Sequence, residues 1–195
     1  MASTRRDHLV DTALDLFNRD GYHATGIDRI LAESGVAKMT LYKHFGSKDA
    51  LIRAVLARRD ERWRDWLRDT VARRAETPRG RLLAVFDALE EWFAGPDFHG
   101  CLFIRAAGEY ARRDDPIHGM AADHQRLVLA DLRDLAAAAG APRPARLARE
   151  IMLLALGAIV ATQVNGPVDA GQAAKKAAEV LIEAALGPAR AAEAT

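Results

Sequence analysis

The sequence has a single cysteine, almost no net charge and no long hydrophobic run. Cys101 alone can form neither an internal disulfide nor a thiolate metal site, which fits a reduced, cytoplasmic setting. A net charge of +1 excludes a polycation, so any surface that binds nucleic acid must be local. The apolar stretch 151–162 is too short to span a bilayer and predicts a buried helix, and no apolar signal core follows Arg5 and Arg6. We therefore expect no membrane association.

Motifs of catalysis and cofactor binding are also missing. The sequence contains no nucleophile–base pair, phosphate loop or metal motif, so we expect neither an enzyme nor a bound cofactor. The spacings of His99, His118 and His124 do not match helical pairs of metal ligands. For Cys101, nothing in the sequence indicates a partner that would lower the thiol pKa, and an inert buried cysteine is favoured over a redox sensor.

Almost every segment of the sequence has apolar residues at helical spacing, and none shows the alternation of apolar and polar residues that is typical of a strand. Glycine and proline divide the pattern, and Thr25 with Asp28 forms a capping-box spacing that predicts Thr25 as an N-cap. We expect an all-α protein with a helix-turn-helix domain over 1–50 and a helical ligand-sensing and dimerisation domain over 51–195. The predicted helices are 4–20, 27–34, 38–45, 47–74, 79–94, 101–113, 116–139, 144–165 and 170–186.

The segment 24–51 carries the functional signal, because two short helices flank a tight turn at Gly35. This is the arrangement that places a second helix in the major groove of DNA. On the helical wheel of 38–45, Leu41 and Phe45 define the buried face, while Met39 and Lys43 point away from it. No acidic residue lies between Lys38 and Lys48, although the first fifty residues as a whole are nearly neutral. We therefore expect one such helix-turn-helix domain, which we call the head, to have modest non-specific affinity for DNA. Binding would then need two heads together.

The sequence here resembles the tetracycline-repressor (TetR) family. The residues that match are Ala13, Leu14, Leu16, Phe17, Gly21, Tyr22, Ala24, Thr25, Ile27, Ile30, Ala32, Gly35, Val36, Thr40, Leu41, Tyr42, His44, Phe45, Ser47, Lys48 and Leu51. A shorter match, residues 100–104 followed by Glu109 and Tyr110, resembles the sensor domain of one branch of the family.

The resemblance implies a homodimer that binds a near-palindromic double-stranded operator and responds to a small-molecule effector. It places Thr25, Tyr42, His44 and Lys48 at phosphate-contacting positions, and Lys38, Met39, Thr40 and Lys43 in the recognition helix, where bases are contacted. Met39 makes no bidentate base contact and at best packs against a thymine methyl group, so the operator sequence is not predicted. Repression, the family's usual role, is also an expectation from the resemblance.

The remainder of the chain has aromatic and sulfur-containing residues suited to an apolar ligand cavity, and two helices that mix bulky and small residues and suit a four-helix dimer interface. The ligand candidates are Trp63, Trp66, Phe86, Trp92, Phe103, Tyr110, Met120 and Met152. The dimer candidates are Leu153, Leu156, Gly157, Val160, Ala178, Leu181, Ile182 and Ala185. We expect most of the aromatic residues to belong to the core.

Two alternatives remain beside a ligand-responsive regulator. One is an enzyme on a helical scaffold, and the other is a partner-binding helical protein whose helix-turn-helix has lost DNA contact. The outward face of 38–45 would then be an ordinary solvated surface. Titration with the DNA that flanks the coding region distinguishes these alternatives.

Overall fold

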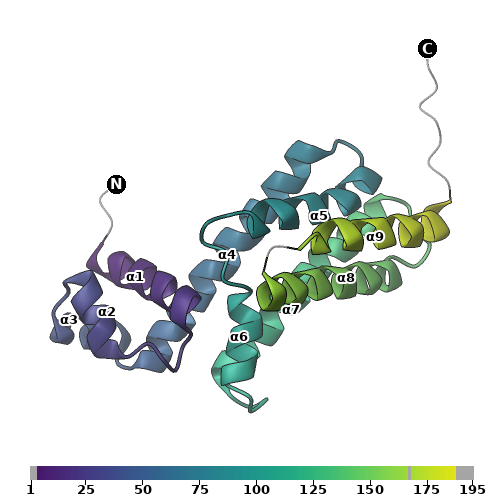
Figure 1. The fold of residues 1–195 in the computed structure, drawn as a ribbon. Coiled ribbons are helices and arrows are strands. Elements are labelled where there is room, and N and C mark those ends of the chain that lie inside the picture. The colour runs from purple at the N-terminus through teal and green to yellow at the C-terminus, as the bar shows by residue number, and fades with distance from the viewer. Residues whose placement is uncertain (1–3, 167, 188–195) are drawn as a thin grey trace. The chain divides into compact units, whose positions relative to one another are not determined.

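The computed structural model describes residues 4–166 and 168–187, and its regular structure is entirely helical (Figure 1). No strand occurs in these ranges, which confirms the all-α prediction. The helices are α1 (Arg5–Asp20), α2 (Ile27–Ser34), α3 (Lys38–Phe45), α4 (Lys48–Arg74), α5 (Pro78–Phe93), α6 (Leu102–Glu109), α7 (Pro116–Ala138), α8 (Pro144–Asn165) and α9 (Ala170–Leu186).

Most predicted helix bounds agree closely with the structure, but the prediction for 101–113 was wrong at its end. Helix α6 stops at Glu109, and Tyr110 leaves the helical region with φ −109° and ψ 67°. Residues 111–114 are all exposed, so a helical continuation would have no apolar face to bury.

The described residues form two compact units. The first unit contains 4–63 and 99–125, and the second contains 64–98, 126–166 and 168–187. Helices α1, α2, α3 and α6 lie in the first unit, and α5, α8 and α9 lie in the second. The predicted boundary at residue 50 divides the chain by function, into a DNA-binding and a ligand-sensing part. The compact units divide it by packing, so the predicted boundary stays a prediction.

The first unit has its core on one face of α1. Val10, Ala13 and Phe17, which recur at helical spacing, are at most 1% exposed. Thr4 caps the helix, since its hydroxyl oxygen accepts a hydrogen bond from the Asp7 N–H at 3.1 Å. Such a cap contributes about 1 kcal/mol to helix stability.

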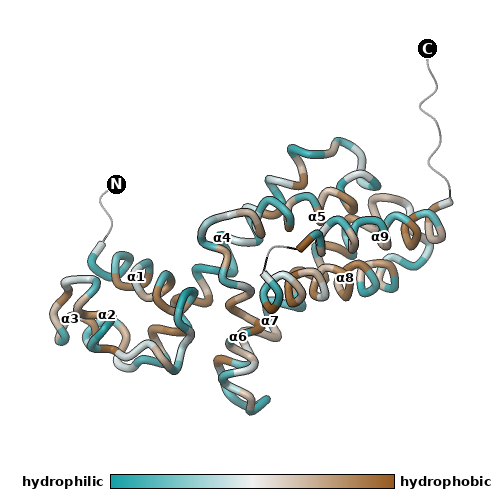
Figure 2. The backbone as a smooth tube through the Cα atoms, in the orientation of Figure 1, coloured by the Kyte–Doolittle hydropathy of each residue, from teal (hydrophilic) through white to brown (hydrophobic). Residues whose placement is uncertain are grey.

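In the second unit, α8 and α9 lie side by side, and α9 also packs against α5 (Figure 1). Hydrophobic residues dominate much of α8 (Figure 2). Helix α8 is long and apolar enough to cross a membrane by length and composition, a test that core helices of soluble proteins also pass. Leu147, Ile151 and Ile159 of α8 are buried inside the unit, as in a core helix.

Candidate nucleic-acid interface

Helix α3 is fixed by one buried side chain and two glycine turns. Leu41 is fully buried, and it holds the helix against the rest of the first unit. Gly35 ends α2 at φ +64°, and Gly46 ends α3 at φ +74°, conformations in which a Cβ would be strained. Their N–H groups donate to the carbonyl oxygens of Leu31 and Tyr42, each at 2.9 Å. These turns set the direction of α3.

The face of α3 opposite Leu41 is exposed. Met39 is 86% exposed and Tyr42 is 44% exposed. Lys43 and His44 are also exposed, whereas Thr40 is half-buried. Three of the predicted DNA-contacting residues thus share one short, uncovered surface, which we call the α3 outward face (Met39, Tyr42 and Lys43).

Two expectations about Thr25 were wrong. Thr25 is fully buried, and its hydroxyl donates to the Gly21 carbonyl oxygen at 2.8 Å, so the side chain is turned away from any phosphate. The N-cap of α2 is Gly26, which makes no side-chain cap bond. Thr25 therefore stabilises the turn after α1 rather than the start of α2.

The basic side chains around α3 differ in how freely they can reach DNA. Lys38 lies 3.5 Å from Asp28 of α2, an exposed pair that water screens strongly. Lys48 is half-buried at the first position of α4. Ser47 caps this helix by accepting a hydrogen bond from the Ala50 N–H at 3.1 Å. Arg6 stacks on the Phe45 ring, with its guanidinium carbon 5.3 Å from the ring centroid.

The turn between α1 and α2 is held by a carboxylate of α6 that sequence reasoning missed in this role. Glu109 accepts hydrogen bonds from the N–H groups of Tyr22 and His23, at 3.0 and 2.6 Å. A Cβ on Gly21, which has φ +90°, would lie 2.8 Å from a Glu109 oxygen. Glycine is required there both for its backbone angle and for the approach of this carboxylate.

Arg105, one turn before Glu109, holds the end of α1. Its guanidinium donates to the carbonyl oxygens of Phe17 and Asn18, at 3.0 and 2.9 Å. The Phe17 carbonyl oxygen also accepts the capping hydrogen bond from the Gly21 N–H, and the carbonyls at this helix end carry partial negative charge, so a cation is favoured there. We call Arg105 and Glu109 the α6 clamp. The sequence shows the two residues four apart, the spacing of a weak surface pair, but it shows nothing of their contacts with the α1–α2 turn.

Tyr22 completes this contact from inside the first unit. Its side chain is fully buried, and its hydroxyl donates to the Leu102 carbonyl oxygen at 3.1 Å. Burial raises the pKa of Tyr22 far above its ordinary value. Burial, followed by the negative charge of Asp49, raises the pKa of Tyr110 to about 12. Both phenols therefore stay neutral at physiological pH.

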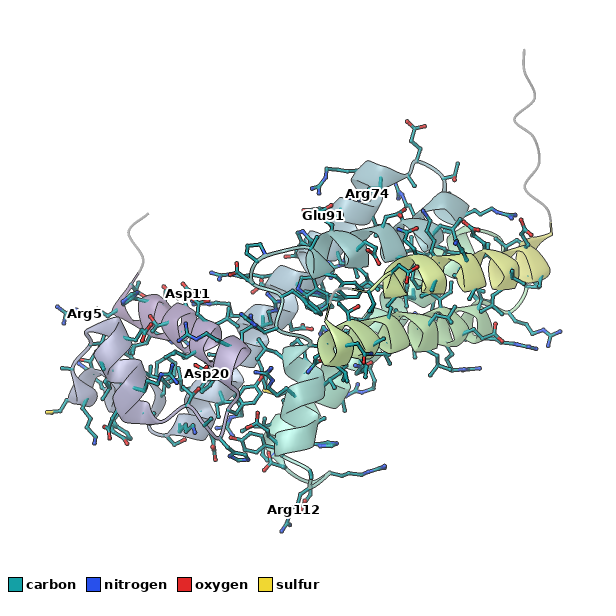
Figure 3. All side chains as sticks on the ribbon, viewed as in Figure 1. Arg5, Asp11, Asp20, Arg74, Glu91 and Arg112 are labelled. Carbon is teal, nitrogen blue, oxygen red and sulfur yellow. The ribbon has the colours of Figure 1, made fainter. Side chains whose placement is uncertain are left out.

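Carboxylates on α1 pair with arginines of α4. Asp11, labelled in Figure 3, accepts hydrogen bonds from Arg58 and Arg62, at 3.1 and 2.9 Å. Arg58 also pairs with Asp7. A hydrogen bond from Thr4, followed by one from Arg58, lowers the pKa of Asp7. Arg58 and Arg62 are therefore paired with carboxylates of α1 rather than available to DNA.

The eight ligand candidates are divided equally between the two units. Trp63, Phe103, Tyr110 and Met120 lie in the first unit, and Trp66, Phe86, Trp92 and Met152 lie in the second. Several are core residues: Phe86 is fully buried, and Phe103 stacks on the His124 ring at 3.7 Å. Large and aromatic side chains fill a packed core as readily as they line a cavity, so size and aromaticity alone do not identify ligand-binding residues.

The second unit contains a cavity of about 460 Å³ between α4, α5 and α7. None of the eight candidates lines it. Its apolar side chains are Leu67, Val71, Ala72, Val85, Val128, Leu132 and Leu135, and its charged ones are Arg68, Asp69, Arg81, Asp131 and Asp134. In the same unit, Arg74 of α4 pairs with Glu91 of α5 at 2.6 Å (Figure 3).

The dimer candidates divide between outward and inward positions. Leu153 and Val160 of α8 are 69% and 42% exposed, and Gly157 lies exposed between them. Leu156, Leu181 and Ala185 are half-buried. The expectation was wrong for Ala178 and Ile182, which are fully buried because this face of α9 packs within the unit. Val164 and Val180, which were not among the candidates, are also exposed, at 74% and 66%.

The histidine and cysteine candidates lie in ordinary packed environments. Nδ1 of His124 lies 2.6 Å from an Asp60 carboxylate oxygen, and Nδ1 of His118 lies 2.9 Å from the Tyr110 carbonyl oxygen. No group of His, Cys, Asp and Glu within 4–166 and 168–187 is arranged to hold a metal ion. Cys101 is buried at the N-cap of α6, and burial raises the pKa of its thiol.

Two family models match the chain. The model "Bacterial regulatory proteins, tetR family" matches residues 9–55, and "Tetracyclin repressor-like, C-terminal domain" matches residues 78–178. The first covers the helix-turn-helix described above, and the second covers more than half of the chain.

Individual relatives agree with this assignment. The activator FasR of Mycolicibacterium smegmatis is 40% identical over 90 residues, which span 44% of this chain and 41% of FasR. The regulator YjdC of Escherichia coli is 25% identical over 83% of this chain and 84% of its own length. The crystal structure of SCO4454, a TetR-family regulator from Streptomyces coelicolor, has a TM-score of 0.86 and 29% identity over 93% of this chain and 96% of that one.

The matched ranges include α3, with the glycine turns at both of its ends, and most of the helical chain that follows it. Members of the family and the relatives above are transcriptional regulators rather than enzymes. The chain belongs to the TetR family of DNA-binding transcriptional regulators.

Proposed function

We propose that this regulator is a cytoplasmic, homodimeric repressor that binds a near-palindromic operator and is released from it by a small molecule. The observation that carries the proposal is the α3 outward face, an exposed apolar, phenolic and basic surface on a helix whose opposite side is anchored by fully buried Leu41. An exposed face of this composition suits the major groove, where base edges and phosphates lie within reach of one helix.

Residues of α3 and the start of α4 divide the work of binding. Lys38, Met39, Thr40 and Lys43 are candidates for base contacts, and Tyr42, His44 and Lys48 for phosphate contacts. Because the head is nearly neutral, one head gains little from counterion release. Two heads, held about 34–36 Å apart, would reach successive major grooves on one side of the duplex.

Exposed apolar residues on α8 and α9 support the dimer. Leu153, Val160 and Val164 follow one another at helical spacing on α8, and Val180 is exposed on the adjacent α9. Two α8–α9 pairs would form a four-helix interface that buries these side chains. Leu153→Lys should therefore shift the protein from dimer to monomer in light scattering. Leu127→Lys, at a residue of α7 that is 42% exposed, is the matched control and should leave the dimer intact.

The cavity of the second unit supports a small-molecule effector. Its volume of about 460 Å³, apolar walls and charged side chains suit a compact ligand with an apolar body and a polar group. The effector would act by favouring a conformation whose heads no longer fit successive grooves, and it must bind that conformation more tightly. FasR is named an activator, so a reporter assay of the regulated promoter with and without the protein decides between repression and activation.

Fluorescence anisotropy with duplexes from the DNA that flanks the coding region tests the proposal. We expect saturable binding of two chains per site, with an affinity that falls steeply as salt increases. Ligands that enter the cavity should lower the affinity, and Val128→Trp, which narrows it, should abolish that response. The absence of saturable, salt-sensitive binding would instead favour a partner-binding protein whose helix-turn-helix no longer contacts DNA.

A further inference from the structure

Met39 is the most exposed large apolar side chain in 4–166 and 168–187, at 86%. It lies about 200° around α3 from buried Leu41, at about 100° per residue, so it points directly away from the core. Lys43 follows it one turn later on the same side, and Tyr42 lies beside them. Met39 lies in the first turn of the helix that is proposed to enter the major groove, where bound DNA would cover it.

Two of the other three candidates for base contacts are less free than Met39. Lys38 is directed toward Asp28, with 3.5 Å between the charged groups, and Thr40 is half-buried. The ammonium of Lys43 and the phenol of Tyr42 carry polar groups that suit phosphates or purine edges. The side chain of Met39 has no hydrogen-bond donor and only a weak thioether acceptor. Its contact with DNA is therefore a packing contact.

Only one group on the major-groove edges of the four bases is apolar, the C5-methyl group of thymine. We propose that Met39 is a specificity-determining residue that reads a pyrimidine C5-methyl group in each operator half-site. The inference rests on the proposed operator binding and adds the chemistry of one contact. Since 5-methylcytosine carries the same methyl group at the same place in the groove, cytosine methylation at this position would strengthen binding.

The size of the effect follows from the area that one methyl group buries. Burying a single methyl or methylene group against an apolar side chain changes affinity by about fourfold. With one such contact in each half-site, removing both methyl groups should weaken the dimer by about sixteenfold, provided the two contacts act independently. The polar and ionic contacts are unchanged by this substitution, so the salt dependence should stay the same.

The test begins by selecting the operator from a library of random DNA duplexes. Single bases of the selected site are then replaced. The selected site is synthesised with deoxyuridine in place of each thymine in turn, which removes the methyl group and keeps the hydrogen-bonding edges. We expect one thymine per half-site whose replacement weakens the wild-type protein about fourfold and leaves Met39→Ala unaffected. At that same position, 5-methylcytosine should bind the wild-type protein about fourfold more tightly than cytosine.

Met39→Ala is expected to fold normally because the side chain is exposed, and its melting curve verifies this. Leu127→Ala truncates another exposed apolar side chain, on α7, and should respond to deoxyuridine as the wild-type protein does. Equal sensitivity of wild-type and Met39→Ala proteins to every deoxyuridine, or no sensitivity in either, overturns the inference. Those outcomes require that DNA binds, so they are distinct from a failure to select any site, which would contradict the proposed function itself.

Discussion

Replacing Glu109 with alanine removes both acceptors that hold the α1–α2 turn. The N–H groups of Tyr22 and His23 would lose partners at 3.0 and 2.6 Å. The Tyr22 side chain is fully buried and its N–H contact is partly shielded, so water replaces the lost acceptor poorly there. His23 is exposed, and its N–H can turn to solvent at smaller cost. The effect should therefore come mainly from Tyr22.

Hydrogen bonds to charged groups contribute about 1.5–3 kcal/mol each when they are shielded from water. Counting Tyr22 in full and discounting exposed His23, we expect Glu109→Ala to lower the free energy of unfolding by about 2–4 kcal/mol. Glu109→Gln retains one carbonyl oxygen as acceptor and should lose about half as much. For a chain of this size, each kcal/mol lowers the melting temperature by about 2–4 °C.

Thermal unfolding combined with amide hydrogen exchange measures this directly. The Tyr22 and His23 amides should exchange faster in Glu109→Ala, while the amides of the α8–α9 pair keep their native protection. Glu61→Ala, which truncates an exposed carboxylate of α4, is the matched control and should change neither quantity. If Glu109→Ala melts at the wild-type temperature and its turn amides stay protected, the α6 clamp does not hold the turn as the distances indicate.

Other predictions concern packing, DNA contact and thiol reactivity. Gly171→Ala should cost about 1–3 kcal/mol in urea unfolding, because its Cβ would lie 2.8 Å from Cδ of Glu90, and Glu90→Ala should remove most of that cost. Lys48→Ala should weaken binding to all DNA sequences and reduce the slope of log affinity against log salt by about 1; an unchanged slope removes Lys48 from the phosphate contacts. Since burial raises the pKa of the Cys101 thiol, iodoacetamide should modify it only after unfolding, and rapid labelling of the native protein would contradict its burial.

Local patterns predicted the head well because its helix ends are chemically marked. Gly21, Gly35 and Gly46 follow the last turns of α1, α2 and α3, each with positive φ, and Leu41 is fully buried as its helical spacing indicates. Thr25 shows the limit of such patterns. Threonine three residues before an aspartate suggests an N-cap, but the hydroxyl donates instead to the carbonyl oxygen of Gly21, which follows α1. The Thr25 hydroxyl has two possible local partners, an N–H group at the start of α2 and the Gly21 carbonyl oxygen, and tertiary packing decides between them.

Contacts distant in sequence were not predictable from periodicity. Glu109 binds N–H groups more than eighty residues away, and its spacing from Arg105 gives no sign of it. On α9, both helix faces contain small and bulky apolar residues, so the sequence alone does not show that Ile182 points inward and Val180 outward. The cavity between α4, α5 and α7 was missed for a related reason, since aliphatic residues line it and the aromatic residues do not.

If the α3 outward face contacts DNA, reversing the charge of Lys43 should weaken operator binding. Lys43 is exposed, so Lys43→Glu should fold as the wild-type protein does while it places a negative charge against the duplex. The measurement is the affinity for the selected operator by anisotropy, compared with Arg133→Glu at an exposed position of α7. We expect a loss of about tenfold or more for Lys43→Glu and little change for Arg133→Glu. Equal affinity of both variants and the wild-type protein would contradict DNA contact by the α3 outward face.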